Sequence, residues 1–282
     1  MEALYPEISS LSDYQKSDKE SLIDSICEGL SAIAKRVLDI DGEKCLAVPV
    51  EYAPIAGLFN KQRILFKHFC DAYNNQDSEI CALFNRILFE AYIKMLYLID
   101  HPEESKSYRA LSFKSHLRIL DEIGDNPITN VFKKKFEFAL KSNGLTIDEI
   151  KSAPKNLGNK SFYDLLKEYM SEKAYAPLYS QPSDSLHSGW NDIRQYYMFY
   201  DDDSDSFVID TDYHAPLKLH YLIAVADLFF DGFRDFLVFL KDEIGFILED
   251  TYVNILAEMR KLLNFGLEDA LITYESNPDS LL

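Results

Sequence analysis

One segment of the chain has almost only apolar side chains, and it constrains the fold more than any other feature. Between Ile80 and Ile99 the polar side chains, apart from the tyrosine hydroxyls, are those of Asn85, Arg86, Glu90 and Lys94. A helix that is apolar on nearly every side has to be buried among other elements. We therefore expect a long helix in this region, buried within a bundle.

Apolar residues recur at helical spacing along most of the remaining chain, which predicts an all-α protein, a helical bundle. The first helix follows Ser17, which serves as its cap, with Glu20 at the capping-box position. Further helices are expected at about 54–73, 103–123, 127–142, 146–152, 160–173, 216–245 and 245–275. Only 10 glycines and 10 prolines occur in the 282 residues, so long helices are permitted.

Two parts of the chain do not fit the helical pattern. Residues 174–186 carry two prolines and three serines and are expected to form a loop. Residues 201–206 read DDDSDS between aromatic side chains, which predicts an irregular or short β-hairpin insertion near 196–211. We expect residues 1–16 to be a disordered or frayed arm. Residues 17–275 are expected to form a single helical domain, because no repeat and no Gly/Ser linker divides them.

The net charge of −18, from 47 acidic and 29 basic side chains, limits the classes of partner. A field of this sign repels phosphate backbones and anionic lipid headgroups, so a general nucleic-acid coat and a membrane partner are not expected. The net charge leaves open a local basic pocket within the acidic protein. A protein partner or a homodimer fits the composition, and RNA or a nucleotide stays an alternative.

Cysteine usage and hydropathy bear on the compartment. The chain has four cysteines: Cys27, Cys45, Cys70 and Cys81. None belongs to a C-x-x-C pair or has a matched histidine spacing, so neither a zinc site nor a disulfide framework is indicated. Residues 1–20 lack the pattern of a secretory signal, and the apolar run at 217–230 contains too many charges for a membrane span. We expect a soluble cytoplasmic protein without a metal or cofactor.

Arg86 and Glu90 lie four residues apart on the expected buried helix, so they project from neighbouring turns toward the same side. A buried guanidinium and a buried carboxylate need partners, because either one left alone costs several kcal/mol. One interpretation is a structural ion pair that fixes the helix register. The other is a charged functional site in the bundle core, with Arg86 and Glu90 as catalytic candidates.

A second set of polar side chains gathers where the expected loop enters a helix: Tyr179, Ser183, Asp184, Ser185 and His187. Ser183 or Asp184 would cap that helix, which explains both without a function. His187 has a pKa range suited to acid or base catalysis, although a helical histidine is more often a packing residue. We take His187 as a catalytic candidate and Tyr179, Ser183 and Asp184 as binding candidates.

Tyr108, Arg109 and His116 form a third set, after the turn that follows the buried helix. Arg109 and His116, and earlier Arg63 and His68, match the loose Arg-x(4 to 6)-His spacing of the HEPN superfamily of helical ribonucleases and nucleotide-binding proteins. Apolar residues follow both arginines, where that motif has a polar one. Arg109 and His116 are weaker catalytic candidates, and Tyr108 is a binding candidate. Gly-rich phosphate loops, nucleophile elbows and H-E-x-x-H helices are absent from the sequence.

The order of these parts resembles a bacterial family of helical proteins of unknown function, HEPN-like in general look. In that family an Arg-x3-Glu helix precedes an Asp-Pro-type break, and a Tyr-x3-Ser-x3-His segment opens a later helix. The corresponding residues are Arg86 and Glu90, then Asp100 and Pro102, and then Tyr179, Ser183 and His187. The glycine expected after the histidine comes one place later, as Gly189. The resemblance covers roughly residues 55–240 and implies that Arg86, Glu90 and His187 converge in one pocket.

Three functions are compatible with these patterns. The first is an interaction or regulatory module in a bacterial stress or phage-defence system, a setting implied by the resemblance, since proteins of this look are often associated with defence or toxin systems. The second is a metal-independent HEPN-type ribonuclease or nucleotide-binding enzyme that uses Arg86, Arg109, His116 or His187 as base, acid or cation. The third is an acidic decoy that mimics nucleic acid.

Overall fold

The computed structural model describes residues 8–39, 45–123, 127–174, 178–179, 190–209 and 217–276. These residues are mainly helical, and their one sheet has two strands, which confirms the predicted all-α fold. The helices before the sheet are α1 (Leu11–Lys16), α2 (Lys19–Leu38), α3 (Ala53–Asn74), α4 (Ser78–Asp100), α5 (Ser105–Ile123), α6 (Pro127–Ser142), α7 (Ile147–Ser152), α8 (Phe162–Tyr169) and α10 (Trp190–Tyr197). After it come α11 (Leu219–Phe239), the π-helical turn η5 (Leu240–Ile244) and α12 (Asp250–Ser276).

The short hairpin predicted near 196–211 is also present. Strands β1 (Met198–Asp201) and β2 (Ser206–Ile209) pair antiparallel, with Met198 opposite Ile209 and Asp201 opposite Ser206. Single-turn 3-10 helices η1 (Pro102–Glu104), η2 (Leu157–Asn159) and η3 (Glu172–Ala174) join other elements. No helix in the described part of the chain is both long enough and apolar enough to cross a bilayer.

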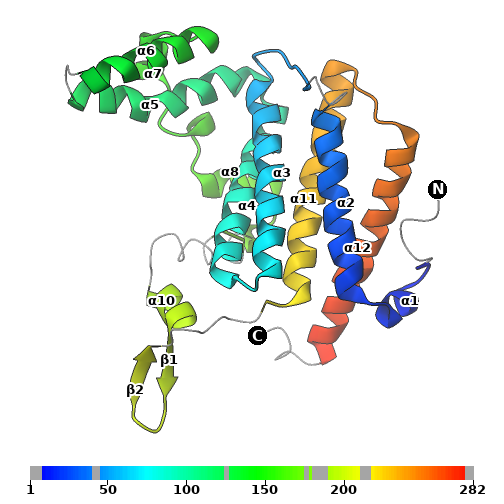
Figure 1. The fold of residues 1–282 in the computed structure, drawn as a ribbon. Helices are drawn as coiled ribbons and strands as arrows, with labels where there is room; N and C mark the ends of the chain where they lie inside the picture. Colours follow the sequence, from blue (N-terminus) through cyan, green and yellow to red (C-terminus); the bar gives the residue numbers. More distant parts are fainter. Residues whose placement is uncertain are drawn as a thin grey trace. The chain divides into compact units, whose positions relative to one another are not determined.

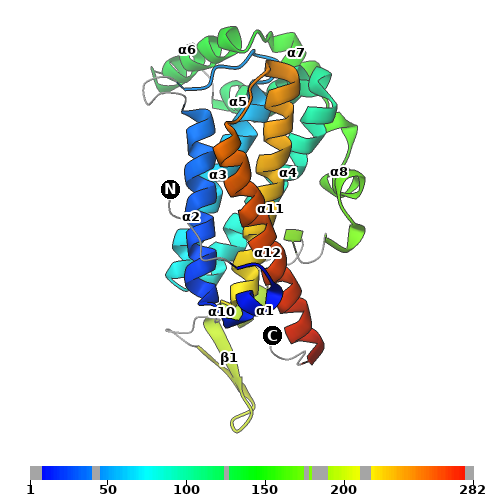
Figure 2. The same cartoon turned by 90° about the vertical axis from the view of Figure 1, so that its right-hand side faces the viewer.

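The described residues divide into two compact units. The first comprises residues up to 46, 59–92 and those from 173 onward, and the second comprises 47–58 and 93–172. In the first unit α2, α3, α4, α11 and α12 run side by side (Figures 1 and 2). The single domain expected for residues 17–275 stays a prediction.

Stacked aromatic rings form the core of the first unit. Phe59 of α3 lies 4.1 Å from Phe236 of α11 between ring centroids, and Phe66 lies 4.3 Å from Phe229. These rings are fully buried, as are Phe69, Phe89 and Phe233. A Phe-rich run in α11, DLFFDGFRDFLVF, supplies one side of this stack. The burial of Phe229, Phe233 and Phe236 places this run in the core.

Helix α4 is buried along its length, as its sequence predicts. Leu88, Phe89, Ile93 and Leu98 have no exposed surface. In the first unit the hydroxyl of Tyr221 on α11 donates to the carbonyl of Cys81 at 3.4 Å. Each fully buried Leu, Ile or Phe contributes about 1.5–3 kcal/mol through the hydrophobic effect, so the burial of α4 is a major source of stability.

Residues 11–16, expected to be part of a frayed arm, form helix α1 instead. The Ser10 side chain caps the helix by accepting from the amide of Asp13. Tyr14 anchors it, since this side chain is fully buried and its ring lies 6.5 Å from that of Phe265 on α12. Burial, together with the charge of Asp269, raises the pKa of Tyr14 to about 12. Tyr14 and a hydrogen bond from Gln15 to Asp269 thus hold a helix too short to be stable alone.

The second unit has a small core of its own under α5, α6 and α7, which lie together in Figure 1. Its buried residues are Ala110, Phe136, Leu140, Leu145 and Ile150. Thr146 and Glu149 form a capping box at the start of α7. Lys106 of α5 donates to Glu149 at 2.5 Å, and this bond, with those from Thr146, lowers the pKa of Glu149 to about 2.

Gly232 permits the close approach of three helices in the first unit. A methyl group at this position would lie 2.6 Å from the Oε1 atom of Gln62 and 3.2 Å from the Tyr92 ring.

We expect Gly232→Ala to lower the free energy of unfolding by about 1–3 kcal/mol, because overpacking forces neighbouring groups to move. Gly57→Ala is the matched control, since nothing lies within 4 Å of an added methyl group there. Gly57→Ala should leave the free energy of unfolding unchanged or raise it by up to about 1 kcal/mol, as measured by urea denaturation. An equal decrease of the free energy of unfolding in both variants would contradict this account.

Candidate functional site

Arg86, Glu90 and Tyr179 form one polar cluster on the first unit. The Arg86 Nη1 atom donates to a carboxylate oxygen of Glu90 at 2.6 Å, and Nη2 donates to the Tyr179 hydroxyl at 2.7 Å. The guanidinium carbon lies 4.2 Å from the centre of the Tyr179 ring. The Arg86 and Glu90 side chains are only 13% and 25% exposed. The spacing of four residues on α4 therefore produces a largely buried ion pair, and a tyrosine 93 positions later completes it.

The geometry of this cluster explains why an arginine occupies position 86. The planar guanidinium carries several N–H donors, so Arg86 binds a carboxylate and a hydroxyl at once while it lies against an aromatic ring. Charge-assisted hydrogen bonds of this kind are stronger than neutral ones, and a cation over a ring adds about 0.5–2 kcal/mol. A lysine ammonium group has no planar array of donors and no flat surface to lie against a ring. The cluster fixes Tyr179 against α4.

A second tyrosine contact lies on the same side of α4. The hydroxyl of Tyr197, the last residue of α10, donates to the Glu79 carboxylate. Glu79 and Arg86 are seven residues apart, two helical turns, so both project from one side of α4. Tyr197 directly precedes β1. The two tyrosines thus connect the region that contains the hairpin to α4.

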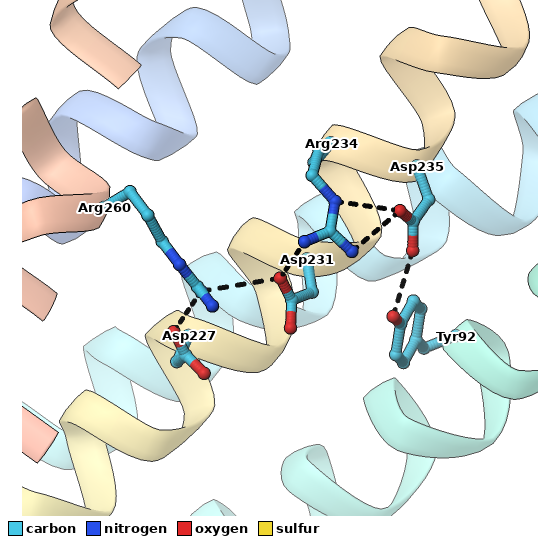
Figure 3. A network of polar contacts seen from close by, with 6 residues as sticks. All are labelled: Tyr92, Asp227, Asp231, Arg234, Asp235 and Arg260. Carbon is cyan, nitrogen blue, oxygen red and sulfur yellow. Dashed lines mark hydrogen bonds and ion pairs between the residues drawn. The ribbon is translucent and has the colours of Figure 1, made fainter. Parts of the chain in front are cut away.

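A network of charged side chains crosses α11 (Figure 3). Arg260 of α12 contacts Asp227 and lies 3.4 Å from Asp231, and Arg234 contacts the same Asp231 oxygen at 2.9 Å. Arg234 also donates to Asp235 at 2.9 Å, and the hydroxyl of Tyr92 on α4 donates to Asp235 at 3.0 Å. The network therefore joins α12, α11 and α4 through a continuous series of polar contacts.

Partial burial shifts the pKa values in this network. Desolvation raises the pKa of Asp227, assisted by the neighbouring Asp231 charge and opposed by Arg260. Desolvation also raises the pKa of Tyr92, and the charge of Asp235 adds to it. At Arg234 burial opposes the charged form, but the hydrogen bond and charge of Asp235 outweigh it and raise the pKa. Each anion lies beside a cation, which is the arrangement expected of a structural network.

A family described as "Family of unknown function (DUF5677)" matches residues 52–207. The chain belongs to this family. The DUF5677 match extends from the start of α3 to β2, and it contains the Arg86–Glu90–Tyr179 cluster and the Tyr197–Glu79 contact. The α11 and α12 residues of the charged network lie outside the match. No curated protein and no solved structure matches the chain. The predicted resemblance to a helical family of unknown function is confirmed, whereas its HEPN-like character stays a prediction.

The other predicted site residues have different surroundings. His187, Ser183 and Asp184 lie outside the described residues, so the expected convergence of His187 with Arg86 and Glu90 stays a prediction. Arg109, in the second unit, donates to the carbonyl of Val50 at 3.0 Å, and burial lowers its pKa against the opposing charge of Glu51. In the same unit His116 is exposed, with its ring 6.1 Å from that of Phe113. Tyr108 is half-buried on α5.

The charged network was missed by the sequence interpretation, although a signal for it exists. Asp227, Asp231 and Asp235 repeat every four residues within an apolar run, which places them along one side of α11. The partner Arg260, from another helix, has no such signal. Within the ranges that the structure covers, His, Cys, Asp and Glu side chains do not gather in groups of three or more suited to a metal ion.

We expect Arg86 and Tyr179 to be energetically coupled. In a double-mutant cycle of Arg86→Ala and Tyr179→Ala, measured by urea denaturation, the coupling energy should be about 1–2 kcal/mol. Tyr200→Ala is the matched control, because the Tyr200 hydroxyl donates to Asp205 within the hairpin. Its effect should add to that of Arg86→Ala without coupling. An additive result for Tyr179 would show that the contact between Arg86 and Tyr179 contributes no stability.

Proposed function

We propose that this DUF5677 chain is a protein-binding module that contacts its partner through the β1–β2 hairpin. The observation that carries the proposal is the exposure of apolar side chains on both faces of the hairpin. Phe199 is 48% exposed and Ile209 is 73% exposed, and Tyr200, Phe207 and Val208 are exposed as well. Concentrated apolar exposure on a water-facing surface is typical of binding sites.

The pairing of the strands gives each face of the hairpin a distinct chemistry. Met198, Ile209, Tyr200 and Phe207 share one face, because Met198 pairs with Ile209 and Tyr200 with Phe207. The Trp190 ring packs edge-on against Phe207 at 5.3 Å, which supports this face. Phe199 and Val208 lie on the other face together with the polar pair Asp201 and Ser206. Isolated two-stranded hairpins are marginally stable in water, so covering these faces would also stabilise the hairpin.

The tip of the hairpin carries the charge that would select the partner. Asp201, Asp202, Asp203 and Asp205 lie in or beside the turn, and the last three are exposed. An apolar ribbon that ends in carboxylates fits an apolar groove bordered by Lys or Arg. Complementary charges of this kind accelerate association and reject acidic partners.

The cluster on α4 has a positioning role in this proposal. The Tyr197–Glu79 bond holds the residue next to β1, and Arg86 holds Tyr179 on the same side of α4. Loops and small insertions on a rigid scaffold commonly carry binding functions. Arg86 and Glu90 then act through Tyr179 and are not catalytic residues. The proposed setting, bacterial stress or phage defence, comes by analogy from the HEPN-like resemblance alone.

We expect a double variant, Phe199→Ser with Ile209→Ser, to lose its partner. Tagged protein would be incubated with a lysate of the source cells, and captured proteins would be quantified by mass spectrometry. The control is Val253→Ser with Ile247→Ser, which removes equally exposed apolar side chains elsewhere. A specific partner should be captured by wild type and control, and its recovery by the hairpin variant should fall about tenfold or more. Equal recovery by all three proteins would overturn the proposal.

The ribonuclease alternative receives less support from the site. The Arg86 guanidinium binds Glu90 and Tyr179, and Arg109 binds a backbone carbonyl, so both cations already have partners within the protein. We expect purified protein, Arg86→Ala and His187→Ala to leave mixed RNA equally intact on denaturing gels. Cleavage by wild type that is lost in either variant would favour the enzyme. If the protein is instead an acidic decoy, its binding would depend on the acidic tip alone. The variant Phe199→Ser with Ile209→Ser would then bind the partner as well as the wild type does.

A further inference from the structure

Helix α6 of the second unit has an exposed apolar stripe that its own unit does not cover. Phe136 and Leu140 face the core, whereas Val131 is 55% exposed and Phe138 is 74% exposed. Val131 and Phe138 are seven residues apart, so they lie on one side of the helix, opposite the core side. Exposed apolar side chains that gather on one side of an element are typical of an interaction surface.

Lysines border this stripe. Lys134, Lys135 and Lys141 are exposed on α6, and Glu137 is the only acidic residue between Pro127 and Ser142. The net charge of the chain is −18, so this basic face contrasts with the remainder of the molecule. Its combination of exposed apolar and cationic groups is the complement of the hairpin, which combines exposed apolar groups with carboxylates.

We infer that the outer face of α6 binds the β1–β2 hairpin of a second copy of this chain. The inference rests on the proposed function, since it names the partner of the same hairpin. Phe199 or Ile209 would cover Phe138 and Val131, and the aspartates of the tip would lie against Lys134 and Lys141. Both surfaces carry the apolar area and the charge that the other requires.

Charge also decides against the symmetric ways of pairing two copies. Two hairpins in contact would bring the four aspartates of one tip, Asp201, Asp202, Asp203 and Asp205, against four more. Two α6 faces in contact would bring lysines together in the same way. Like charges placed opposite one another across an interface are unfavourable. The contact is therefore head-to-tail, with the hairpin of one copy on α6 of the next, and such contacts form rings or open chains.

Complementation between two defective variants tests this contact. The hairpin variant is Phe199→Ser with Ile209→Ser, and the α6 variant is Val131→Ser with Phe138→Ser. Each lacks one surface and keeps the other. In sedimentation velocity, wild type should form species larger than one copy that dissociate at high salt. Each variant alone should remain at the mass of one copy, with self-association weakened about tenfold or more. An equimolar mixture of the two should form a species of two copies, because one intact hairpin meets one intact α6.

Two charge-reversal variants provide an independent test of the same contact. Lys134→Glu with Lys141→Glu should abolish self-association, and adding the Asp202→Lys, Asp203→Lys protein should restore a mixed species. Far-UV circular dichroism shows whether each variant keeps its helices, and the mixtures report on binding even if one variant is less stable. If the wild type stays at one copy at every concentration, or if mixtures do not associate, the inference is overturned. The proposed function would still stand if the hairpin variant fails to capture a different protein that the wild type captures. Both the proposed function and the inference would fail if no captured protein depends on the hairpin.

Discussion

The apolar surface of α4 has to be covered on nearly every side, and the rest of the structure depends on this constraint. In the first unit α3 contacts α4 where the Cys81 thiol donates to the Phe69 carbonyl, and α11 contacts it where the Tyr221 hydroxyl donates to the Cys81 carbonyl. Close approach at Gly232 lets Gln62 and Tyr92 reach α11. In the second unit the same helix continues with Ile93 and Leu98, which are fully buried.

A helix buried in this way can carry charge only where the charge is compensated. Arg86 is paired with Glu90 and lies on Tyr179, so its desolvation is offset by an anion, a hydroxyl and a ring. The same rule governs α11, where three aspartates alternate with arginines from α11 and α12. These polar contacts join α12 to α11 and α11 to α4 at defined positions.

The two surfaces proposed to bind have the same kind of composition. The hairpin and α6 both expose aromatic and aliphatic side chains, and they carry opposite charges. Apolar exposure supplies the free energy of association, and charge restricts the partners, so the proposed contacts combine affinity with selection. In an acidic chain, a row of lysines beside an exposed phenylalanine limits the partner more than the net charge does.

The sequence by itself determined the helical fold, the approximate bounds of the helices, the hairpin around DDDSDS and the buried character of α4, because periodicity and turn residues act over a few neighbouring positions. It also placed Arg86 and Glu90 on one side of a helix. The tertiary structure alone decided that Tyr179 meets Arg86, that Arg260 joins the aspartates of α11 and that Tyr14 holds α1 on α12. Those partners are tens to hundreds of residues apart, and no local pattern encodes which distant side chain completes a contact.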